Sequence, residues 1–207
     1  MSSWLNSSAV HCALSASAVP DGFDGHSAHD EAGLVQEAQT NAAAFTQLYQ
    51  QYVERVYSYV RTRTRTEADA SDLTQQVFLR ALDGLSRYRG KDTSFATWLF
   101  RIARNTVADF HRRQRSTVTW DLVPEALQPQ MEHDVDAELI RHEAIARLRT
   151  LFDALDPEIR ELLVLRFGAG LGVTEIAAVI GKSEAATRKR LYRTIQTLKE
   201  QYRDDAR

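Results

Sequence analysis

Residues 172–199 read GVTEIAAVIGKSEAATRKRLYRTIQTLK. The apolar residues in the first part of this stretch favour a short helix from Thr174 to Ile180. Gly181 and Ser183 then form a turn signal, because glycine tolerates the backbone of a tight turn and serine caps a following helix by accepting a free backbone N–H. The stretch therefore predicts a helix, a tight turn and a second helix.

The second helix, which follows Ser183, has two unlike faces. Its apolar or small residues recur at i, i+4, i+8 and i+11 and form a core-facing stripe, namely Thr187, Leu191, Ile195 and Leu198. The other side carries bases, with Lys189 and Arg193 among them. A helix-turn-helix of this kind sets its second helix into the major groove of DNA. An ordinary solvated helical hairpin is the alternative interpretation.

Charge is segregated along the chain, although the net charge is only −2. No lysine or arginine precedes Arg55, five arginines and one acid lie within 101–115, and six bases and one acid lie within 182–199. Two basic patches on a near-neutral chain predict two separate contacts with nucleic acid.

The composition excludes several classes of protein. The 207 residues are 43% hydrophobic and 26% charged, which is normal for a globular protein of one or two domains. No apolar run approaches the roughly 18 residues that a membrane span needs. The N-terminus does not have the pattern of a signal peptide, and the single cysteine, Cys12, excludes an internal disulfide framework. We therefore expect a cytoplasmic protein without membrane insertion.

Residues 1–40 are rich in Ser, Ala, Gly, Asp and His and show no sustained period, so we expect a disordered acidic extension. Several residues that bind metals elsewhere occur here. His11 and Cys12 are adjacent, however, and their spacing to His26 and His29 matches no zinc pattern. We predict no metal site.

Two amphipathic helices are predicted next, over residues 43–62 and 68–82. The pattern of the second helix turns one set of residues inward, namely Leu73, Val77, Phe78, Ala81 and Leu82. It leaves another set outside, namely Asp69, Asp72, Gln75, Gln76 and Arg80. This polar face is either a solvated surface or a docking surface for a protein partner.

A basic loop over residues 84–94 and a helix over residues 95–113 follow. The loop carries Tyr88, which we expect to be exposed, and the helix combines an apolar face containing Trp98 with arginines beside it. Aromatic rings beside arginines suit unpaired nucleic acid, because stacking contributes about 1–3 kcal/mol per base and arginines neutralise phosphates. Packing in the core is the alternative role of Trp98.

The helical pattern stops at residues 116–136, a stretch with prolines and acids that we interpret as a linker. Helices resume over residues 136–155 and again from Pro157, with Asp156 as the cap and apolar residues through Phe167. No strand pattern occurs. The expected fold is all-α, with two small helical domains, 41–115 and 137–207, joined by a flexible linker. The C-terminal domain ends in the helix-turn-helix.

Three stretches resemble parts of the extracytoplasmic-function (ECF) sigma factors of the sigma-70 family. DASDLTQQVFLRAL, residues 69–82, resembles their polymerase-binding helix, and FATWLFRIARNTVADFHRRQR, residues 95–115, resembles their promoter −10 helix. LDPEIRELLVLRF, residues 155–167, together with residues 172–199 resembles their −35-reading domain. The resemblance covers about residues 41–200 and keeps the family order. It departs from the family pattern at Gln76, where a glutamate is usual.

The resemblance implies a factor that binds core RNA polymerase through the β′ and β subunits and directs promoter-specific transcription initiation. It implies polymerase contacts at Asp69, Asp72, Gln75, Gln76 and Phe78. It implies reading and melting of the −10 element by Arg87, Tyr88, Arg89, Lys91, Trp98, Arg101, Arg104, Asn105, Asp109, Arg112 and Arg113. It implies reading of the −35 element by Ser183, Thr187, Arg188, Lys189, Tyr192 and Arg193. An anti-sigma factor is a further implied partner, beside promoter DNA.

Two rival functions fit parts of the pattern. A stand-alone helix-turn-helix regulator, which does not bind core polymerase as a sigma factor, explains the C-terminal half equally well. It does not explain a basic aromatic helix beside a polar docking helix. We do not expect an enzyme, because no glycine-rich phosphate loop, metal-ligand cluster or nucleophile–base pair stands out. For the same reason we expect no cofactor and no small-molecule substrate.

Overall fold

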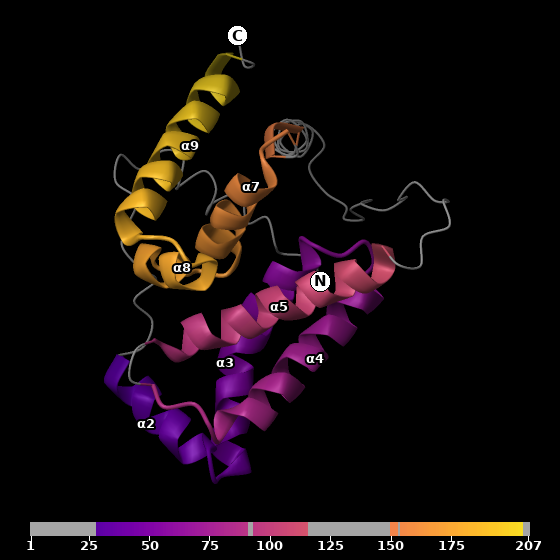
Figure 1. The fold of residues 1–207 in the computed structure, drawn as a ribbon, viewed down its shortest axis with the longest axis vertical. Helices are drawn as coiled ribbons and strands as arrows, with labels where there is room; N and C mark the ends of the chain where they lie inside the picture. Colours follow the sequence, from indigo (N-terminus) through magenta and orange to yellow (C-terminus); the bar gives the residue numbers. More distant parts are fainter. Residues whose placement is uncertain (1–27, 91–92, 116–149, 153, 205–207) are drawn as a thin grey trace, which may run out of the picture.

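The computed structural model describes residues 28–90, 93–115, 150–152 and 154–204. Every regular element within these ranges is a helix, and the helices form two groups (Figure 1). The N-terminal group consists of α2 (Ala28–Ala38), α3 (Ala42–Arg61), α4 (Glu67–Leu85) and α5 (Phe95–Arg115). The C-terminal group consists of α7 (Pro157–Leu163), the π-helix η1 (Val164–Gly168), α8 (Val173–Ile180) and α9 (Glu184–Asp204). The predicted all-α class is confirmed for the described residues, and the expected linker lies outside them.

Helices α3, α4 and α5 pack against one another around an apolar core (Figure 1). A side-chain cap begins each of them. Asn41 accepts a 2.9 Å hydrogen bond from the backbone N–H of Ala43, Thr66 accepts one of 3.0 Å from Asp69, and Ser94 accepts one of 3.2 Å from Thr97. Each helix buries large apolar side chains, including Leu48, Val56, Val77, Leu99 and Phe100. The predicted inward face of the second helix is wrong at Leu82, which is 48% exposed because it lies at the edge of the stripe centred on Val77 and Ala81.

Helix α2 corrects the expectation that residues 1–40 are a disordered extension. Residues 28–38 are helical and pack on α3, with Val35 and Ala38 buried. The hydroxyl of Tyr52 on α3 also donates a hydrogen bond to the carboxylate of Glu31. A segment with few apolar residues and weak periodicity becomes helical here because α3 covers its narrow apolar side. His11, Cys12 and His26 lie outside the described residues.

The C-terminal group follows the predicted order of caps and turns. Asp156 accepts a 2.9 Å hydrogen bond from the backbone N–H of Glu158 and starts α7, with Pro157 in its first turn. Gly181 ends α8 in the left-handed region, at φ 70°, which an L side chain rarely adopts. Ser183 then accepts a 3.3 Å hydrogen bond from the backbone N–H of Ala186 and starts α9. These features confirm the predicted helix-turn-helix.

The segment between α7 and α8 differs from the prediction in one respect. Residues 164–168 form a π-helix, in which the backbone N–H of Ala169 bonds to the carbonyl oxygen of Val164 at 2.9 Å. The wider turn breaks the period of 3.6 residues on which the prediction depends. Phe167, expected to fill the helix, is consequently 47% exposed. Most of the helix expected over residues 136–155 lies outside the described part, although residues 150–152 are helical.

The two groups of helices contact each other along one seam, where α8 packs against α5 and η1 packs against α3 (Figure 1). Helix α9 lies on the far side of α8 from α5. None of the helices in the described ranges combines the length and the apolar character that a membrane crossing requires.

Candidate nucleic-acid interface

The outer face of α4 carries most of the residues predicted to contact polymerase. Asp72, Gln75 and Gln76 are exposed. Leu79 is 62% exposed and extends this stripe at the spacing i, i+3, i+4, i+7. We call these four residues the α4 stripe. Sequence reasoning missed Leu79, although this spacing is the signal that identifies it.

Two predicted polymerase contacts, Asp69 and Phe78, have roles within the fold. The carboxylate of Asp69 accepts a 2.7 Å hydrogen bond from the hydroxyl of Thr66, so it belongs to the N-terminal cap of α4. Phe78 is 5% exposed, and its ring meets that of Tyr49 edge-on at 4.7 Å between centroids. The prediction that Phe78 contacts a partner is wrong, because a residue two positions beyond Gln76 lies on nearly the opposite side of a helix.

Tyr88 was predicted to be exposed, but it is half-buried in an aromatic cluster. Its ring lies 5.0 Å from that of Trp98 and 6.0 Å from that of Phe95, between centroids. Its hydroxyl donates a 2.7 Å hydrogen bond to the carbonyl oxygen of Thr93. Burial raises the pKa of the Tyr88 phenol. Arg87 and Arg89 are exposed beside this cluster, and Lys91 lies outside the described residues.

Trp98 is also half-buried. Its exposure lies between that of a surface ring, which could stack on a base, and that of a core residue. Its six-membered ring packs on Gly84, where an added Cβ would come within 3.1 Å of the indole. The ring also tilts against Phe95 at 5.6 Å between centroids. Gly84 therefore gives Trp98 the space to pack beside Tyr88, with the two ring planes tilted by 41°.

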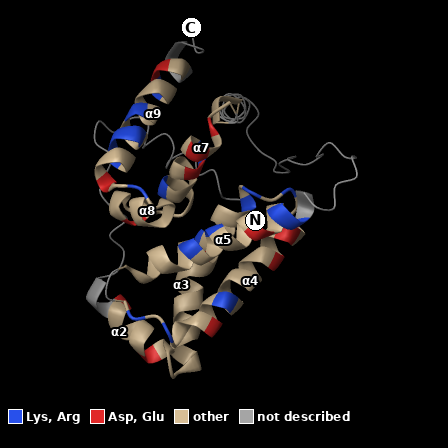
Figure 2. Ribbon diagram, in the orientation of Figure 1, with Lys and Arg blue, Asp and Glu red and all other residues tan. Residues whose placement is uncertain are grey.

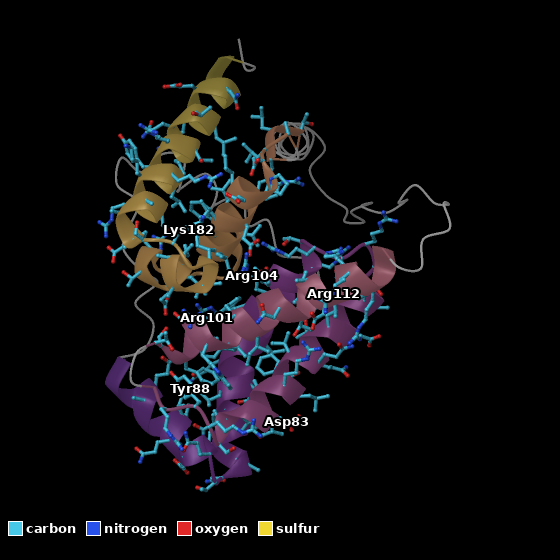
Figure 3. All side chains as sticks on the ribbon, in the orientation of Figure 1. Asp83, Tyr88, Arg101, Arg104, Arg112 and Lys182 are labelled. Carbon is cyan, nitrogen blue, oxygen red and sulfur yellow. The ribbon has the colours of Figure 1, made fainter. Side chains whose placement is uncertain are left out.

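Arg101 and Arg104 of α5 are exposed, but both have partners in the C-terminal group. Arg101 donates hydrogen bonds of 3.1 and 2.7 Å from Nε and a terminal nitrogen to the carbonyl oxygen of Ala178. Arg104 forms a 3.1 Å ion pair with Glu161. Figure 2 marks the basic residues along α5, and Figure 3 labels Arg101 and Arg104.

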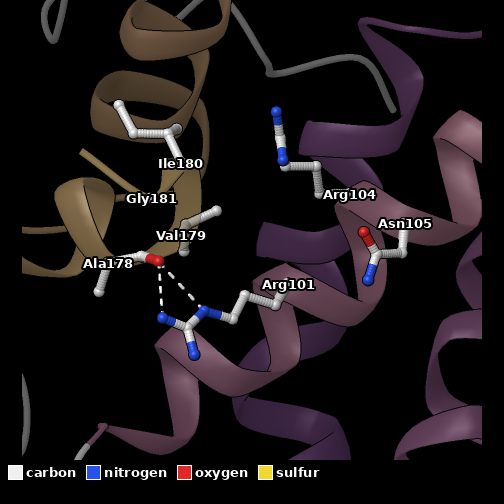
Figure 4. Close-up of a pocket in the computed structure, with 7 residues that line it drawn as sticks. All are labelled: Arg101, Arg104, Asn105, Ala178, Val179, Ile180 and Gly181. Atoms are coloured by element: carbon white, nitrogen blue, oxygen red, sulfur yellow. Dashed lines mark hydrogen bonds between the residues drawn. The ribbon is translucent and has the colours of Figure 1, made fainter.

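A cavity of about 300 Å³ opens between α5 and the end of α8 (Figure 4). Arg101, Arg104 and Asn105 line one side of it, and residues 178–181 line the other. Three residues predicted to read the −10 element thus share one space. In the described arrangement the last turn of α8 occupies the opposite wall.

The end of α5 forms a separate charged group. Asp109 accepts hydrogen bonds from Arg80 of α4 at 3.2 Å and from Arg112 at 3.0 Å. Arg80 also donates to the hydroxyl of Thr106 at 3.1 Å. Asp109 therefore positions two arginines, while Arg112, whose side chain is 77% exposed, points to solvent. Arg113 is exposed as well.

Further contacts along the seam were not predicted. Arg55 of α3 donates a 2.7 Å hydrogen bond to the carbonyl oxygen of Ala169, and Ser94 donates one of 2.7 Å to Glu175. Tyr59 donates a 3.1 Å hydrogen bond to Glu161, and burial raises the pKa of its phenol. Arg55 lies three residues from Tyr52, so a cation shares a helix face with a buried tyrosine. This was the one local signal that could have indicated a contact of Arg55 within the fold.

Helix α9 presents the predicted DNA-facing residues away from the seam. Arg188, Lys189, Tyr192 and Arg193 are exposed, and Tyr192 is 58% exposed. Arg188 donates a 2.6 Å hydrogen bond to Glu184, and this bond lowers the pKa of the Glu184 carboxyl. Leu191, Ile195 and Leu198 are buried on the other side, as predicted. Figure 2 shows the resulting row of basic residues on α9.

Two neighbours of this surface have other roles. Thr187 is 2% exposed and donates a 3.0 Å hydrogen bond to the carbonyl oxygen of Ser183, so it is a core residue and not a DNA contact. The prediction is wrong here because Thr187 belongs to the same apolar stripe as Leu191. Arg190 turns toward α7 and forms a 2.7 Å ion pair with Glu158. Ser183 is exposed and acts as the cap of α9.

Comparison with known proteins matches both groups of helices to one family. The family described as Sigma-70 region 2 matches residues 48–117, and the family described as Sigma-70, region 4 matches residues 145–203. The first match contains α4 and α5, and the second contains α7, η1, α8 and nearly all of α9. The first match contains the predicted polymerase and −10 surfaces, and the second contains the predicted −35 surface.

Two curated relatives and one solved structure are similar over most of the chain. The chain is 40% identical to the ECF RNA polymerase sigma factor BldN of Streptomyces coelicolor over 179 residues, which are 84% of this chain and 66% of BldN. It is 32% identical to the ECF RNA polymerase sigma factor SigD of Mycobacterium tuberculosis over 152 residues, which are 70% of this chain and 71% of SigD. The chain thus spans just under two thirds of the length of BldN.

The similar solved structure is that of CnrH in complex with the cytosolic domain of CnrY. It superposes with a TM-score of 0.61 and 27% sequence identity, and the alignment covers 84% of this chain and 97% of CnrH. Sequence families, relatives and fold agree, so the chain belongs to the extracytoplasmic-function group of the sigma-70 family of RNA polymerase sigma factors.

Proposed function

We propose that this protein binds core RNA polymerase and directs promoter-specific initiation of transcription, by reading −35 and −10 elements and helping to melt DNA. The observation that supports this most strongly is the presence of three distinct surfaces on one chain. They are the α4 stripe, the basic face of α5 beside the Tyr88 cluster, and the exposed basic row of α9. In this function the protein works in the cytoplasm as a binding factor and not as an enzyme.

The α4 stripe is the proposed contact with the coiled coil of the polymerase β′ subunit. Asp72 supplies charge, Gln75 and Gln76 supply hydrogen bonds, and Leu79 supplies an exposed apolar side chain near the middle of the helix. Partner surfaces often combine a desolvated apolar anchor with a polar rim. Gln76, where the family usually has a glutamate, leaves Asp72 as the one acid of the stripe.

The face of α5 is the proposed −10 surface. Arginines neutralise phosphates, and the Tyr88 and Trp98 rings offer a stacking surface for an unpaired base. Extruding a base costs a few kcal/mol, so a preformed aromatic cluster beside arginines offsets part of that cost. Asp109 contributes by positioning Arg80 and Arg112, since its carboxylate bonds to both.

The exposed row of α9 is the proposed −35 surface. Arginine reads guanine through two hydrogen bonds, at about 1–3 kcal/mol of discrimination per contact. Arg188 and Arg193 are five residues apart, so they approach different positions along the groove, and we expect one base contact and one phosphate contact. The described arrangement leaves this row open to DNA, because α9 lies beyond α8 from the seam.

Full engagement of promoter DNA by α5 requires the seam to open. Ala178 and Glu161 occupy donors of Arg101 and Arg104 and compete with phosphates for them. The ion pair is accessible to solvent, with side chains 45% and 23% exposed, so it contributes only about 0–1 kcal/mol. Polymerase, by holding the two domains apart, makes each weak DNA contact effectively intramolecular.

A protein that holds the two domains is a further proposed partner. The relative CnrH was solved with the cytosolic domain of CnrY. We propose an anti-sigma factor as a partner of this chain, one that keeps the domains from polymerase and promoter until it is released.

Competition for core polymerase tests the proposal against a stand-alone regulator. The chain is mixed with purified core polymerase and a labelled sigma factor of another group, and displacement of the label is measured. We expect displacement by the unaltered chain and none by a variant that carries Asp72→Lys. A chain that binds DNA but never displaces the label is a stand-alone regulator. Transcription from a promoter library by core polymerase plus the chain then identifies the recognised promoter.

A further inference from the structure

Helix α2, which lies outside both matched families, is fastened to the Tyr88 cluster at two points. It is itself anchored, because Val35 and Ala38 are buried against α3. The first attachment is indirect: Glu31 accepts a hydrogen bond from Tyr52, and the ring of Tyr52 meets that of Phe95 at 5.4 Å between centroids. Phe95 in turn contacts Tyr88, so α2 supports one side of the cluster.

The second attachment is direct. The side-chain amide of Gln39, just after α2, donates a 2.8 Å hydrogen bond to the carbonyl oxygen of Tyr88, 49 residues away in sequence. Both residues are half-buried, so water competes less for this bond than at an open surface. The bond joins two segments that are far apart in the sequence.

The backbone around Tyr88 depends on this support. Its amide bonds to Leu85 at 3.1 Å, which closes the turn after α4, and its hydroxyl reaches the carbonyl oxygen of Thr93. Gly90 has a left-handed backbone at φ 63° and lies against the tyrosine ring. These contacts are all local to the turn. Among the hydrogen bonds described above, only that of Gln39 ties the Tyr88 backbone to another part of the N-terminal domain.

We propose that Gln39 is a positioning residue for base capture: it holds the Tyr88 backbone so that the Tyr88 and Trp98 rings are preformed for an unpaired −10 base. The inference rests on the proposed function, because base capture is the task assigned to this cluster. A stacking surface gains affinity when its rings do not have to be ordered on binding. Loss of the Gln39 donor leaves the rings present but frees the turn that carries Tyr88.

The test compares three variants of the full chain. Gln39→Met keeps the length of the side chain and removes its donor, whereas Gln39→Lys supplies a donor again. Gln36→Met is the matched control, since Gln36 is an exposed glutamine of α2, three residues before Gln39. The holoenzyme of each variant is titrated with a labelled single-stranded oligonucleotide carrying the non-template −10 sequence of the library-selected promoter. Affinity for core polymerase is measured in parallel.

We expect Gln39→Met to bind the oligonucleotide about fivefold more weakly, the size of one lost hydrogen bond. Gln39→Lys and Gln36→Met should stay within about twofold of the unaltered chain, and core affinity should not change in any variant. Equal affinity of Gln39→Met and the unaltered chain would overturn the proposal. So would an equal loss in Gln36→Met, or a loss that follows reduced core binding.

Quenching of Trp98 fluorescence tests the role of Gln39 independently of the proposed function. Trp4→Phe and Trp120→Phe leave Trp98 as the single tryptophan of the chain. Acrylamide quenching of Trp98 should increase in Gln39→Met and not in Gln36→Met, whether or not the chain acts with polymerase. Failure of the unaltered chain to bind core polymerase contradicts the proposed function, while unchanged quenching contradicts the role of Gln39.

Discussion

Arg101 on α5 donates two hydrogen bonds to the carbonyl oxygen of Ala178, which lies 77 residues further along the chain. Ala178 is in the last turn of α8, where carbonyl groups lack partners within the helix and carry partial negative charge. A guanidinium group suits such a helix end. The same arginine is proposed to contact promoter DNA, so DNA and the end of α8 compete for it.

Locking the seam should block promoter opening. Ser94 and Glu175, which share a 2.7 Å hydrogen bond across the seam, are replaced by cysteine in a Cys12→Ser background and bridged by a short bis-methanethiosulfonate. We expect transcription from the selected promoter to fall by about tenfold or more, because the bridge removes the open state. Reductant should restore it. The unbridged double variant is the control, and full activity of the bridged chain would show that α5 does not need to leave α8.

Removing the two arginines at the ends of the proposed −35 row should abolish −35-dependent transcription. Arg188→Ala with Arg193→Ala removes one expected base contact and one phosphate contact, a loss of about 10- to 100-fold in affinity for the −35 element. Core binding should be unaffected. Arg190→Ala is the matched control, because Arg190 bonds to Glu158 of α7. If all three substitutions weakened DNA binding alike, α9 would not read DNA with the face proposed.

Reversing the charge of Asp72 should have the opposite pattern. Asp72→Lys places a base in the α4 stripe, and we expect core polymerase affinity to fall by about tenfold or more because like charges at an interface are costly. Affinity of the isolated chain for −35 DNA should not change. Glu54→Lys, an exposed acid on α3, is the control. Retained polymerase affinity in Asp72→Lys would exclude the α4 stripe as the docking surface.

Substitutions at two neighbouring residues of α4 should distinguish an effect on stability from an effect on polymerase binding. Phe78→Ala removes a ring that is 5% exposed, so the free energy of unfolding should decrease by about 3–5 kcal/mol in chemical denaturation. Leu79→Ala changes a side chain that is 62% exposed, and stability should change by less than about 0.5 kcal/mol. Core polymerase affinity should nevertheless drop about fivefold in Leu79→Ala. A stable Phe78→Ala variant with lost docking would restore the original assignment of Phe78.

The features that sequence reasoning predicted correctly have local causes. The helix-turn-helix depends on Gly181, on the Ser183 cap and on a regular apolar period, all within one stretch. Phe78 and Thr187 lie on the buried sides that the helical period predicted for them, and only the contacts that the resemblance implied for them disagree with their burial. Leu82 is the residue whose predicted side is wrong. A period locates the stripe, but its edges depend on neighbours that the period does not describe.

The features that sequence reasoning missed depend on distant contacts. Helix α2 has weak periodicity and is stabilised by α3, through Val35, Ala38 and the bond from Tyr52 to Glu31. The partners of Arg101 and Arg104 lie 77 and 57 residues away, on helices whose packing no local pattern reports. The basic face of α5 was predicted correctly, whereas its coverage by α8 required the tertiary structure.

Promoter-directed transcription from purified components tests whether this chain directs core polymerase to a promoter. Core polymerase, the selected promoter and this chain are combined, and the run-off transcript and its start site are measured. We expect a transcript of defined start that requires both the chain and the polymerase, and that is lost with Asp72→Lys and with Arg188→Ala plus Arg193→Ala. A chain that binds the same DNA while core polymerase produces no specific transcript would not be acting as a sigma factor.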